Sequence, residues 1–246
     1  MNHTEIRPVK IPEQLLSGFL EFAKEVNRKS VERGIKFTEE QLTEIFNNSF
    51  SGKVRAIFFL HIGDINRILE GIQLIYDDLS ELKKNRDAFK GNPVIRSELL
   101  FQSFFNEFFR IRELSKIFIK VLCKSEVLDK RNKEIITDSY FEAFEGVYEI
   151  RNNFVHNGLS FKDRDITLDY SVLEKFFPEE KENFSSLLNW ENTREGTIAL
   201  QCAIYMKFIG EIIEQYITFQ EMLNGVLADL IILYEKQFQV DIEVDI

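Results

Sequence analysis

Residues 151–156 of the chain, RNNFVH, combine a permanent cation, an amide and a histidine. Cleavage of a phosphodiester without a metal needs groups of these kinds: a base and an acid for the proton transfers, and a cation for the charge that develops on the phosphate. On a helix, Asn152 and His156 are four positions apart and therefore lie on one face. Arg151, Asn152 and His156 are accordingly the candidate catalytic residues.

The spacing of arginine and histidine carries little information by itself. A loose pattern, Arg followed by His five to seven positions later, is expected about 0.5 times by chance in this composition. Arg55 and His61 also meet it. Requiring Asn directly after Arg, and His four positions after that Asn, lowers the chance expectation to roughly 0.01. Only Arg151, Asn152 and His156 satisfy the strict form.

The end of the predicted motif helix suggests a protonated histidine. Asn157-Gly158 is a helix stop, so we expect His156 in the last turn, where the negative end of the helix dipole favours the imidazolium. No acidic residue lies three or four positions from Arg151, so its partner is expected on another element, with Glu107 as a candidate. The alternative is that Arg151 and His156 only cap the carbonyls of a helix end.

Apolar residues recur at three- and four-residue spacing and predict an all-α fold. Predicted helices cover residues 13–33, a short segment opened by the capping box of Thr38 and Gln41, and then 53–89, 93–124, 129–156 and 193–238. Ser51-Gly52 is expected to end the short helix, and Pro93 to begin a long one whose phenylalanines form a core face. A short strand or extended arm is expected near residues 165–170.

The expected architecture is an elongated helical bundle. An N-terminal helical extension would cover residues 1–52, and four core helices would lie within residues 53–246, with an insertion over 159–192 after the motif helix. The length of 246 residues suits one large domain with such additions.

The net charge of −10 argues against broad, non-specific binding to nucleic acid, but it permits a local basic patch. Between residues 110 and 133, eight basic residues stand against three acidic ones. Four of them recur at four-residue steps and form the candidate RNA-binding stripe: Arg112, Lys116, Lys120 and Lys124. A solvated face of an amphipathic helix explains the stripe equally well.

Several kinds of site are not predicted. The chain lacks a glycine-rich phosphate loop and the patterns Glu-x-x-His, His-x-x-x-His and Cys-x-x-Cys, so we expect no cofactor and no metal. The N-terminus shows no signal peptide. The most hydrophobic stretch, residues 198–217, is interrupted by Lys207, Glu211 and Glu214, so we expect a cytoplasmic protein without a membrane partner.

Arg-Asn-x-x-x-His near the end of a helix in an all-α chain resembles the signature of the HEPN superfamily (higher eukaryotes and prokaryotes nucleotide-binding domains). The resemblance covers residues 53–238. It implies a homodimeric, metal-independent endoribonuclease that cleaves RNA through a 2′,3′-cyclic phosphate, in stress or phage defence. His156 would transfer protons, Arg151 would stabilise the phosphorane, and Asn152 would orient phosphate or histidine. Other members have lost catalysis and bind nucleotides, RNA or proteins, which is the alternative.

The resemblance has one departure. Some toxin members carry a tyrosine two positions after the histidine, which a partner nucleotidyltransferase modifies, and here that position is Gly158. An antitoxin or regulatory protein is therefore a partner that the superfamily suggests, but the residue for this mode of control is missing.

Overall fold

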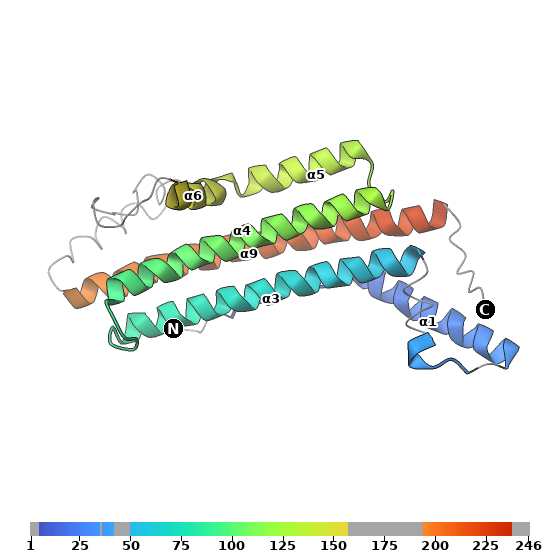
Figure 1. The fold of residues 1–246 in the computed structure, drawn as a ribbon, viewed down its shortest axis with the longest axis horizontal. Helices are drawn as coiled ribbons and strands as arrows, with labels where there is room; N and C mark the ends of the chain where they lie inside the picture. The colour runs from blue at the N-terminus through green and yellow to red at the C-terminus, as the bar shows by residue number, and fades with distance from the viewer. Residues whose placement is uncertain (1–4, 35, 42–49, 157–193, 238–246) are drawn as a thin grey trace. The chain divides into compact units, whose positions relative to one another are not determined.

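The computed structural model describes residues 5–34, 36–41, 50–156 and 194–237. These residues form α-helices and contain no strand, which confirms the predicted all-α helical bundle (Figure 1). The predicted insertion over 159–192, with its possible strand near 165–170, lies outside the described residues.

Six helices are described. They are α1 (Glu13–Arg33), α3 (Phe50–Lys84), α4 (Pro93–Lys124), α5 (Lys130–Ala143), α6 (Glu145–His156) and α9 (Arg194–Gln237). The predicted bounds of α1 and α4 are confirmed at both ends. Gly34 closes α1 in the left-handed conformation with φ of 66°, where glycine carries no steric penalty.

Side-chain caps explain the start of α4 and of the helical residues 39–41. Asn92 Oδ1 accepts the Val94 N–H at 2.9 Å directly before Pro93, which begins α4. In the predicted capping box, the Thr38 N–H donates to Gln41 Oε1 at 3.0 Å, and the Gln41 N–H donates to Thr38 Oγ1 at 3.2 Å. These bonds satisfy amides that a helix end leaves without partners.

Both predicted ends of the second long helix are wrong. Ser51 and Gly52, expected to separate two helices, lie in the first turn of α3, since one glycine costs a helix only about 1 kcal/mol. At the other end α3 stops at Lys84 rather than Phe89. Asn85 ends it by forming a turn, in which its side chain accepts the Asp87 N–H at 3.0 Å and its carbonyl accepts the Ala88 N–H at 3.0 Å.

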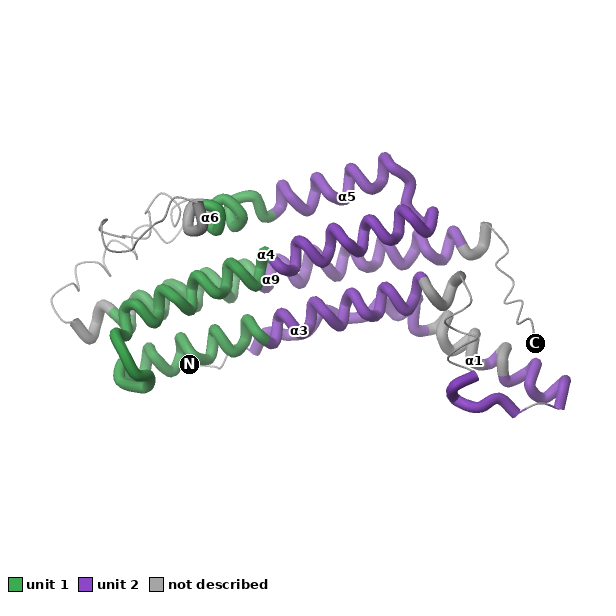
Figure 2. The backbone as a smooth tube through the Cα atoms, in the orientation of Figure 1, with its two compact units in different colours: residues 1–4, 71–109, 144–212 green, residues 5–70, 110–143, 213–246 purple. Residues whose placement is uncertain are grey.

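The described helices belong to two compact units, coloured separately in Figure 2. Unit 1 contains the described residues of Gly71–Phe109 and Phe144–Ile212. Unit 2 contains Glu5–Glu70, Arg110–Ala143 and Ile213–Ile246. Helices α3, α4 and α9 therefore each contribute one part to both units, and the predicted boundary between residues 52 and 53 falls inside α3.

The core of unit 1 is aromatic. Phe101 of α4 stacks on Tyr205 of α9, with ring centroids 3.9 Å apart and planes inclined by 6°. Phe104 and Phe208 meet edge to face at 6.2 Å, and both are 0% exposed. Such ring pairs stabilise a core beyond the area that they bury. The predicted phenylalanine face of α4 is thus confirmed as core packing.

The core of unit 2 is crossed by hydrogen-bonded polar side chains. Ser115 and Tyr216 both bond to the Tyr140 hydroxyl. The Tyr216 hydroxyl donates to Gln220 Oε1 at 3.1 Å, and Gln220 Nε2 donates to Asn224 Oδ1 at 2.8 Å. We call these five residues the polar ladder. Burial raises the pKa of Tyr140 to about 12.

The two members of the loose Arg–His match are also buried in unit 2. His61 stacks on Phe118 with centroids 4.1 Å apart, and desolvation lowers the pKa of His61 to about 4. Arg55 is 6% exposed and donates from Nη1 to the Leu15 carbonyl at 2.8 Å. Both residues therefore act in core packing, as the weakness of the loose pattern indicated.

Within α9, residues Gln201–Tyr234 are long and apolar enough to cross a membrane by length and composition. Core helices of soluble proteins pass the same criterion. Cys202, Phe208, Tyr216 and Leu227 of this helix are fully buried, but only 39% of its most apolar window is buried. The expectation of no membrane partner stays a prediction.

Candidate functional site

The motif lies on α6, which is separate from α5. The prediction of one helix over residues 129–156 is wrong, because α5 ends at Ala143 and α6 begins at Glu145. Between them, the Phe144 carbonyl accepts the N–H of Val147 at 3.0 Å and that of Tyr148 at 3.2 Å. The apolar spacing continues through this break, so periodicity alone could not reveal it.

Phe144 and Tyr148 attach α6 to α4 within unit 1. Both residues pack on Phe108, with ring centroids 5.4 Å and 6.0 Å from it. Phe144, Val147 and Tyr148 are buried, so the apolar face of α6 is fixed before the motif begins. Arg151 follows Tyr148 by three positions and therefore emerges beside this face.

Arg151 is half-buried and lies over an aromatic ring. Its guanidinium carbon is 4.1 Å from the ring centroid of Phe109, the residue next to Phe108 on α4. A cation over the face of phenylalanine is attracted by the negative face of the ring, so the stack both holds and desolvates the guanidinium. The partner of Arg151 on another helix is thus an aromatic ring.

That partner is not a carboxylate. Among the described residues, the polar and cation–π contacts of Arg151 are with Asn152 and Phe109, and the suggested ion pair with Glu107 does not form. The Nη1 atom lies 3.5 Å from Asn152 Oδ1, at the outer limit of a hydrogen bond. The Nε atom is buried and has no hydrogen-bond partner in the described part of the chain. The guanidinium of Arg151 therefore has no carboxylate partner among the described residues.

Asn152 and His156 complete the motif on the same helix. Asn152 is exposed, and His156 is the last residue of α6. The backbone of His156 therefore lies in the final turn, where the helix dipole favours a cation. The predicted stop at Asn157-Gly158 falls outside the described residues.

The predicted RNA-binding stripe does not form one uniform surface. Arg112 and Lys116 both lie over the ring of Phe141 on α5, at 3.9 Å and 5.1 Å from its centroid. Lys116 Nζ also pairs with Glu113 at 3.0 Å. Lys120 and Lys124 are exposed. All four residues belong to unit 2, whereas the motif belongs to unit 1.

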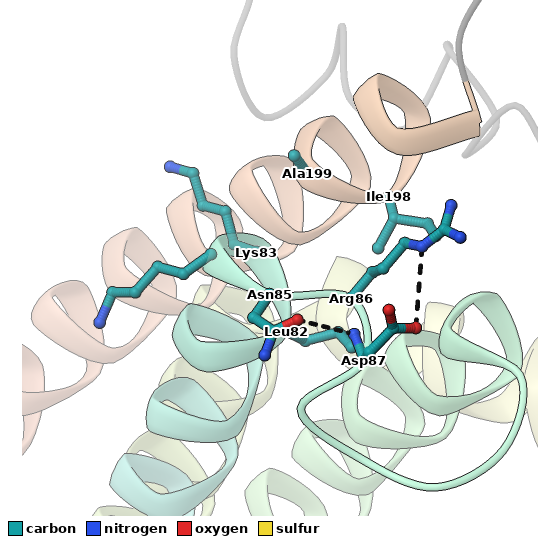
Figure 3. A pocket seen from close by; sticks show the side chains of 8 residues that line it. Leu82, Lys83, Asn85, Arg86, Asp87, Ile198 and Ala199 are labelled. Atoms are coloured by element: carbon teal, nitrogen blue, oxygen red, sulfur yellow. Dashed lines mark hydrogen bonds and ion pairs between the residues drawn. The ribbon is translucent and has the colours of Figure 1, made fainter.

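Unit 1 has a basic surface of its own, which the sequence analysis missed. A hollow of about 290 Å³ lies where the turn after α3 meets the start of α9 (Figure 3). Its basic residues are Lys83, Lys84 and Arg86, and Arg86 pairs with Asp87 at 3.7 Å. The run KKNRDAFK over residues 83–90, with four basic residues and one acidic, was the available signal. We call this surface the basic corner.

The described residues offer little other reactive chemistry. They contain no group of three His, Cys, Asp or Glu residues that could hold a metal ion. Cys202 is fully buried, and burial raises the pKa of its thiol to about 12, which keeps it from acting as a thiolate nucleophile at neutral pH.

Comparisons with known protein families, with curated proteins and with solved structures found no match to this chain. The residues of α6 and their contacts therefore provide the basis for a functional proposal.

Proposed function

We propose that the protein is a metal-independent endoribonuclease of HEPN type that acts as a homodimer. The observation that carries the proposal is Arg151, a half-buried guanidinium held on Phe109 without an ion pair among the described residues. A cation is costly to desolvate without a counter-ion, and a phosphate group would provide one. Arg151 opens the Arg-Asn-x-x-x-His motif, five positions before His156 at the end of α6, and this position supports RNA phosphate as that anion.

The proposed reaction is an in-line attack within the RNA. A base removes the ribose 2′-OH proton, the 2′-oxygen bonds to phosphorus, and the P–O5′ bond breaks as an acid protonates the leaving 5′-oxygen. The products are a 2′,3′-cyclic phosphate and a 5′-hydroxyl. His156 transfers the protons, while Arg151 stabilises the charge of the phosphorane and Asn152 orients phosphate or histidine. Because each chain supplies one motif histidine, a dimer provides both the acid and the base.

The basic corner supports RNA as the substrate class. Lys83, Lys84 and Arg86 belong to the same unit as the motif and form a local positive surface in a chain of net charge −10. Phosphate-binding cations attract RNA in a salt-dependent manner. The proposed role in stress or phage defence rests on the HEPN resemblance alone.

Cleavage of a labelled single-stranded RNA in the presence of EDTA tests the proposal. Arg151→Ala and His156→Ala should each lower the cleavage rate by about 10²–10³, as removal of one transition-state donor does in other enzymes. Arg96→Ala is the matched control, since it removes an arginine that lies over the ring of Phe89, outside the motif and the predicted RNA-binding stripe. Analysis of the product ends should reveal the 2′,3′-cyclic phosphate.

The same experiment distinguishes RNA cleavage from the alternative function, which is RNA binding without cleavage. If the wild-type protein leaves RNA intact but binds it, and Arg151→Ala removes that binding, the protein is a non-catalytic RNA-binding module. If all three variants match the wild type in cleavage and binding, the motif has only a structural role and the proposal is wrong.

A further inference from the structure

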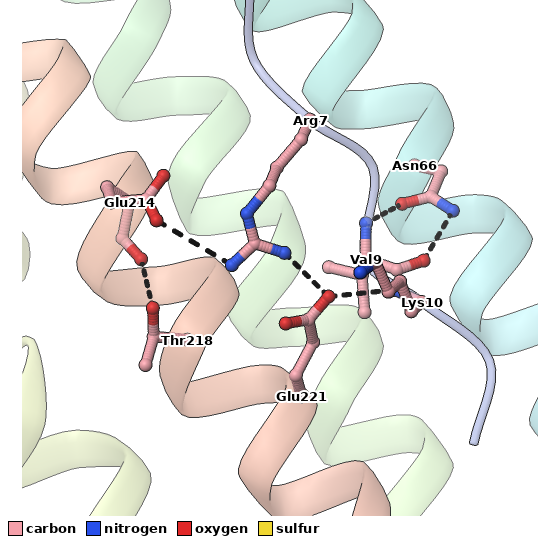
Figure 4. A network of polar contacts seen from close by, with 7 residues as sticks. All are labelled: Arg7, Val9, Lys10, Asn66, Glu214, Thr218 and Glu221. Carbon is pink, nitrogen blue, oxygen red and sulfur yellow. Dashed lines mark hydrogen bonds and ion pairs between the residues drawn. The ribbon is translucent and has the colours of Figure 1, made fainter. Parts of the chain in front are cut away.

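The N-terminal segment of the chain crosses two helices of unit 2 in an extended form. Residues 5–12 contain no helix and lie over α3 and α9 (Figure 4). Val9 is 2% exposed, so its side chain is buried at this crossing. We call residues 5–12 the strap.

Asn66 of α3 binds the backbone of the strap at two points. Its Oδ1 accepts the Val9 N–H at 2.8 Å, and its Nδ2 donates to the Val9 carbonyl at 3.1 Å. One side-chain amide therefore satisfies both polar groups of one residue. Asn66 binds the main chain of the strap and not a side chain, so an extended peptide of another sequence forms the same two hydrogen bonds.

Two glutamates of α9 bind the charged side chain of the strap. Arg7 Nη1 donates to Glu221 Oε1 at 2.7 Å, and Arg7 Nη2 lies 3.6 Å from Glu214 Oε1. Glu221 Oε1 also accepts the Lys10 backbone N–H at 3.2 Å. Glu214 and Glu221 are seven positions apart and hence on one face of α9, and Figure 4 shows Arg7 between them.

These contacts define a recognition rule. The acidic pair selects a basic side chain, the amide holds the residue two positions later, and the buried site of Val9 selects a small branched apolar side chain. Main-chain bonds that supply affinity and side-chain sites that supply specificity are the usual means of peptide recognition. The strap satisfies the rule as Arg7-Pro8-Val9.

We propose that Asn66, Glu214 and Glu221 form a binding site for an extended peptide with the pattern Arg-x-Val, which the chain fills with its own strap until a partner's segment replaces it. The ion pairs are open to solvent in part, which favours exchange: the side chains of Arg7, Glu214 and Glu221 are 37%, 66% and 27% exposed. Such exposed pairs contribute little stability, and the strap competes mainly through its high local concentration.

Binding of a peptide in trans tests the site in the full chain. The probe is a fluorescent peptide of residues 5–12, EIRPVKIP, and the variant Arg7→Glu places a carboxylate against the two glutamates and releases the strap. This variant should bind the peptide at least about tenfold more tightly than the wild type, whose own strap occupies the site. Lys24→Glu, an equal charge change at an exposed position of α1, should behave as the wild type.

Two further measurements identify the site. Adding Asn66→Leu to Arg7→Glu should abolish binding, and so should replacing arginine with glutamate in the peptide. Faster amide hydrogen exchange in residues 5–12 shows that the strap is released. If these amides stay protected in Arg7→Glu, the double variant Arg7→Glu with Val9→Asp is used instead. The proposal fails if a folded variant with a released strap does not bind the peptide, or binds it equally well without Asn66. A dimer that the peptide dissociates would support the site, with a second copy as the partner.

Discussion

The two units use the same three long helices but build different cores from them. In unit 1 the buried residues between α4 and α9 include several packed aromatic rings, such as the pair of Phe101 and Tyr205. In unit 2 the same two helices bury the polar ladder, together with His61 of α3. An aromatic core tolerates small shifts, whereas a hydrogen-bonded ladder favours one register. The candidate active site lies on the unit with the aromatic core, and the strap lies on the unit with the polar one.

The largest effect is expected from opening the aromatic core. Phe104 is 0% exposed and contacts four other phenylalanine rings, so Phe104→Ala should lower the free energy of unfolding by about 3–5 kcal/mol. Denaturant titration measures the change. Leu74→Ala, at a position of unit 1 that is 67% exposed, should cost less than about 0.5 kcal/mol. Equal costs at both positions would show that unit 1 does not depend on its aromatic core.

Acid should weaken unit 2 through His61. Its folded pKa of about 4 lies below the unfolded value of 6.5, so its contribution is present above pH 6.5 and is lost as pH falls towards 4. The loss amounts to about 3 kcal/mol, since burial leaves little solvent screening. His61→Phe keeps a ring over Phe118 and removes a titrating group, so this part of the pH dependence should disappear.

Unfolding free energies of wild type and His61→Phe at pH 7 and pH 4.5 provide the comparison. Carboxylates titrate equally in both proteins and cancel in the difference. The same pH dependence in both proteins would mean that His61 is not desolvated. Unit 2 would then not differ from unit 1 by a buried histidine.

The polar ladder should show coupling between its members. Asn224→Leu leaves Gln220 Nε2 without its acceptor and should cost about 1–3 kcal/mol. Gln220→Leu with Asn224→Leu should cost less than the sum of the single changes, because the second replacement removes the stranded donor. Strictly additive costs in a double-mutant cycle would indicate that the two residues act independently.

The smallest effect concerns Arg151 and Arg112, two of the arginines that lie over phenylalanine rings. Phe109→Leu removes the ring beneath Arg151, and Phe141→Leu removes the ring beneath Arg112. Each change should cost about 0.5–1 kcal/mol of stability. Only Phe109→Leu should slow RNA cleavage, by about two- to fivefold, because it releases the guanidinium of the proposed site. Equal cleavage rates in the two variants would show that the Phe109 ring beneath Arg151 does not contribute to RNA cleavage.

Local signals in the sequence predicted much of the fold. Gly34, Asn92-Pro93 and the Thr38–Gln41 capping box act within a few residues, and the structure follows all three. Ser51-Gly52 failed as a breaker because the cost of one glycine is small beside the packing of a long helix. The break at Phe144 was missed because burial on Phe108 keeps the apolar spacing intact across it.

The candidate site was predicted only in part. The motif indicated Arg151 and the absence of a local carboxylate, since both depend on neighbours along one helix. Its partner Phe109 is 42 positions away in the sequence and is fixed by packing between helices, which no spacing rule describes. The basic corner was readable as a charge run over residues 83–90, but its position beside the start of α9 required the structure.

The turn at Phe144 determines the direction in which the motif residues point around the axis of α6. Because α6 starts anew at Glu145, an added residue before this point changes α5 without turning α6. A residue added between Phe144 and Arg151 would rotate everything beyond it by about 100° and carry the guanidinium away from Phe109. The separation of seven residues between Phe144 and Arg151 thus fixes the position of the guanidinium. Loop grafting or shortening of the chain is therefore best confined to sequence before Phe144.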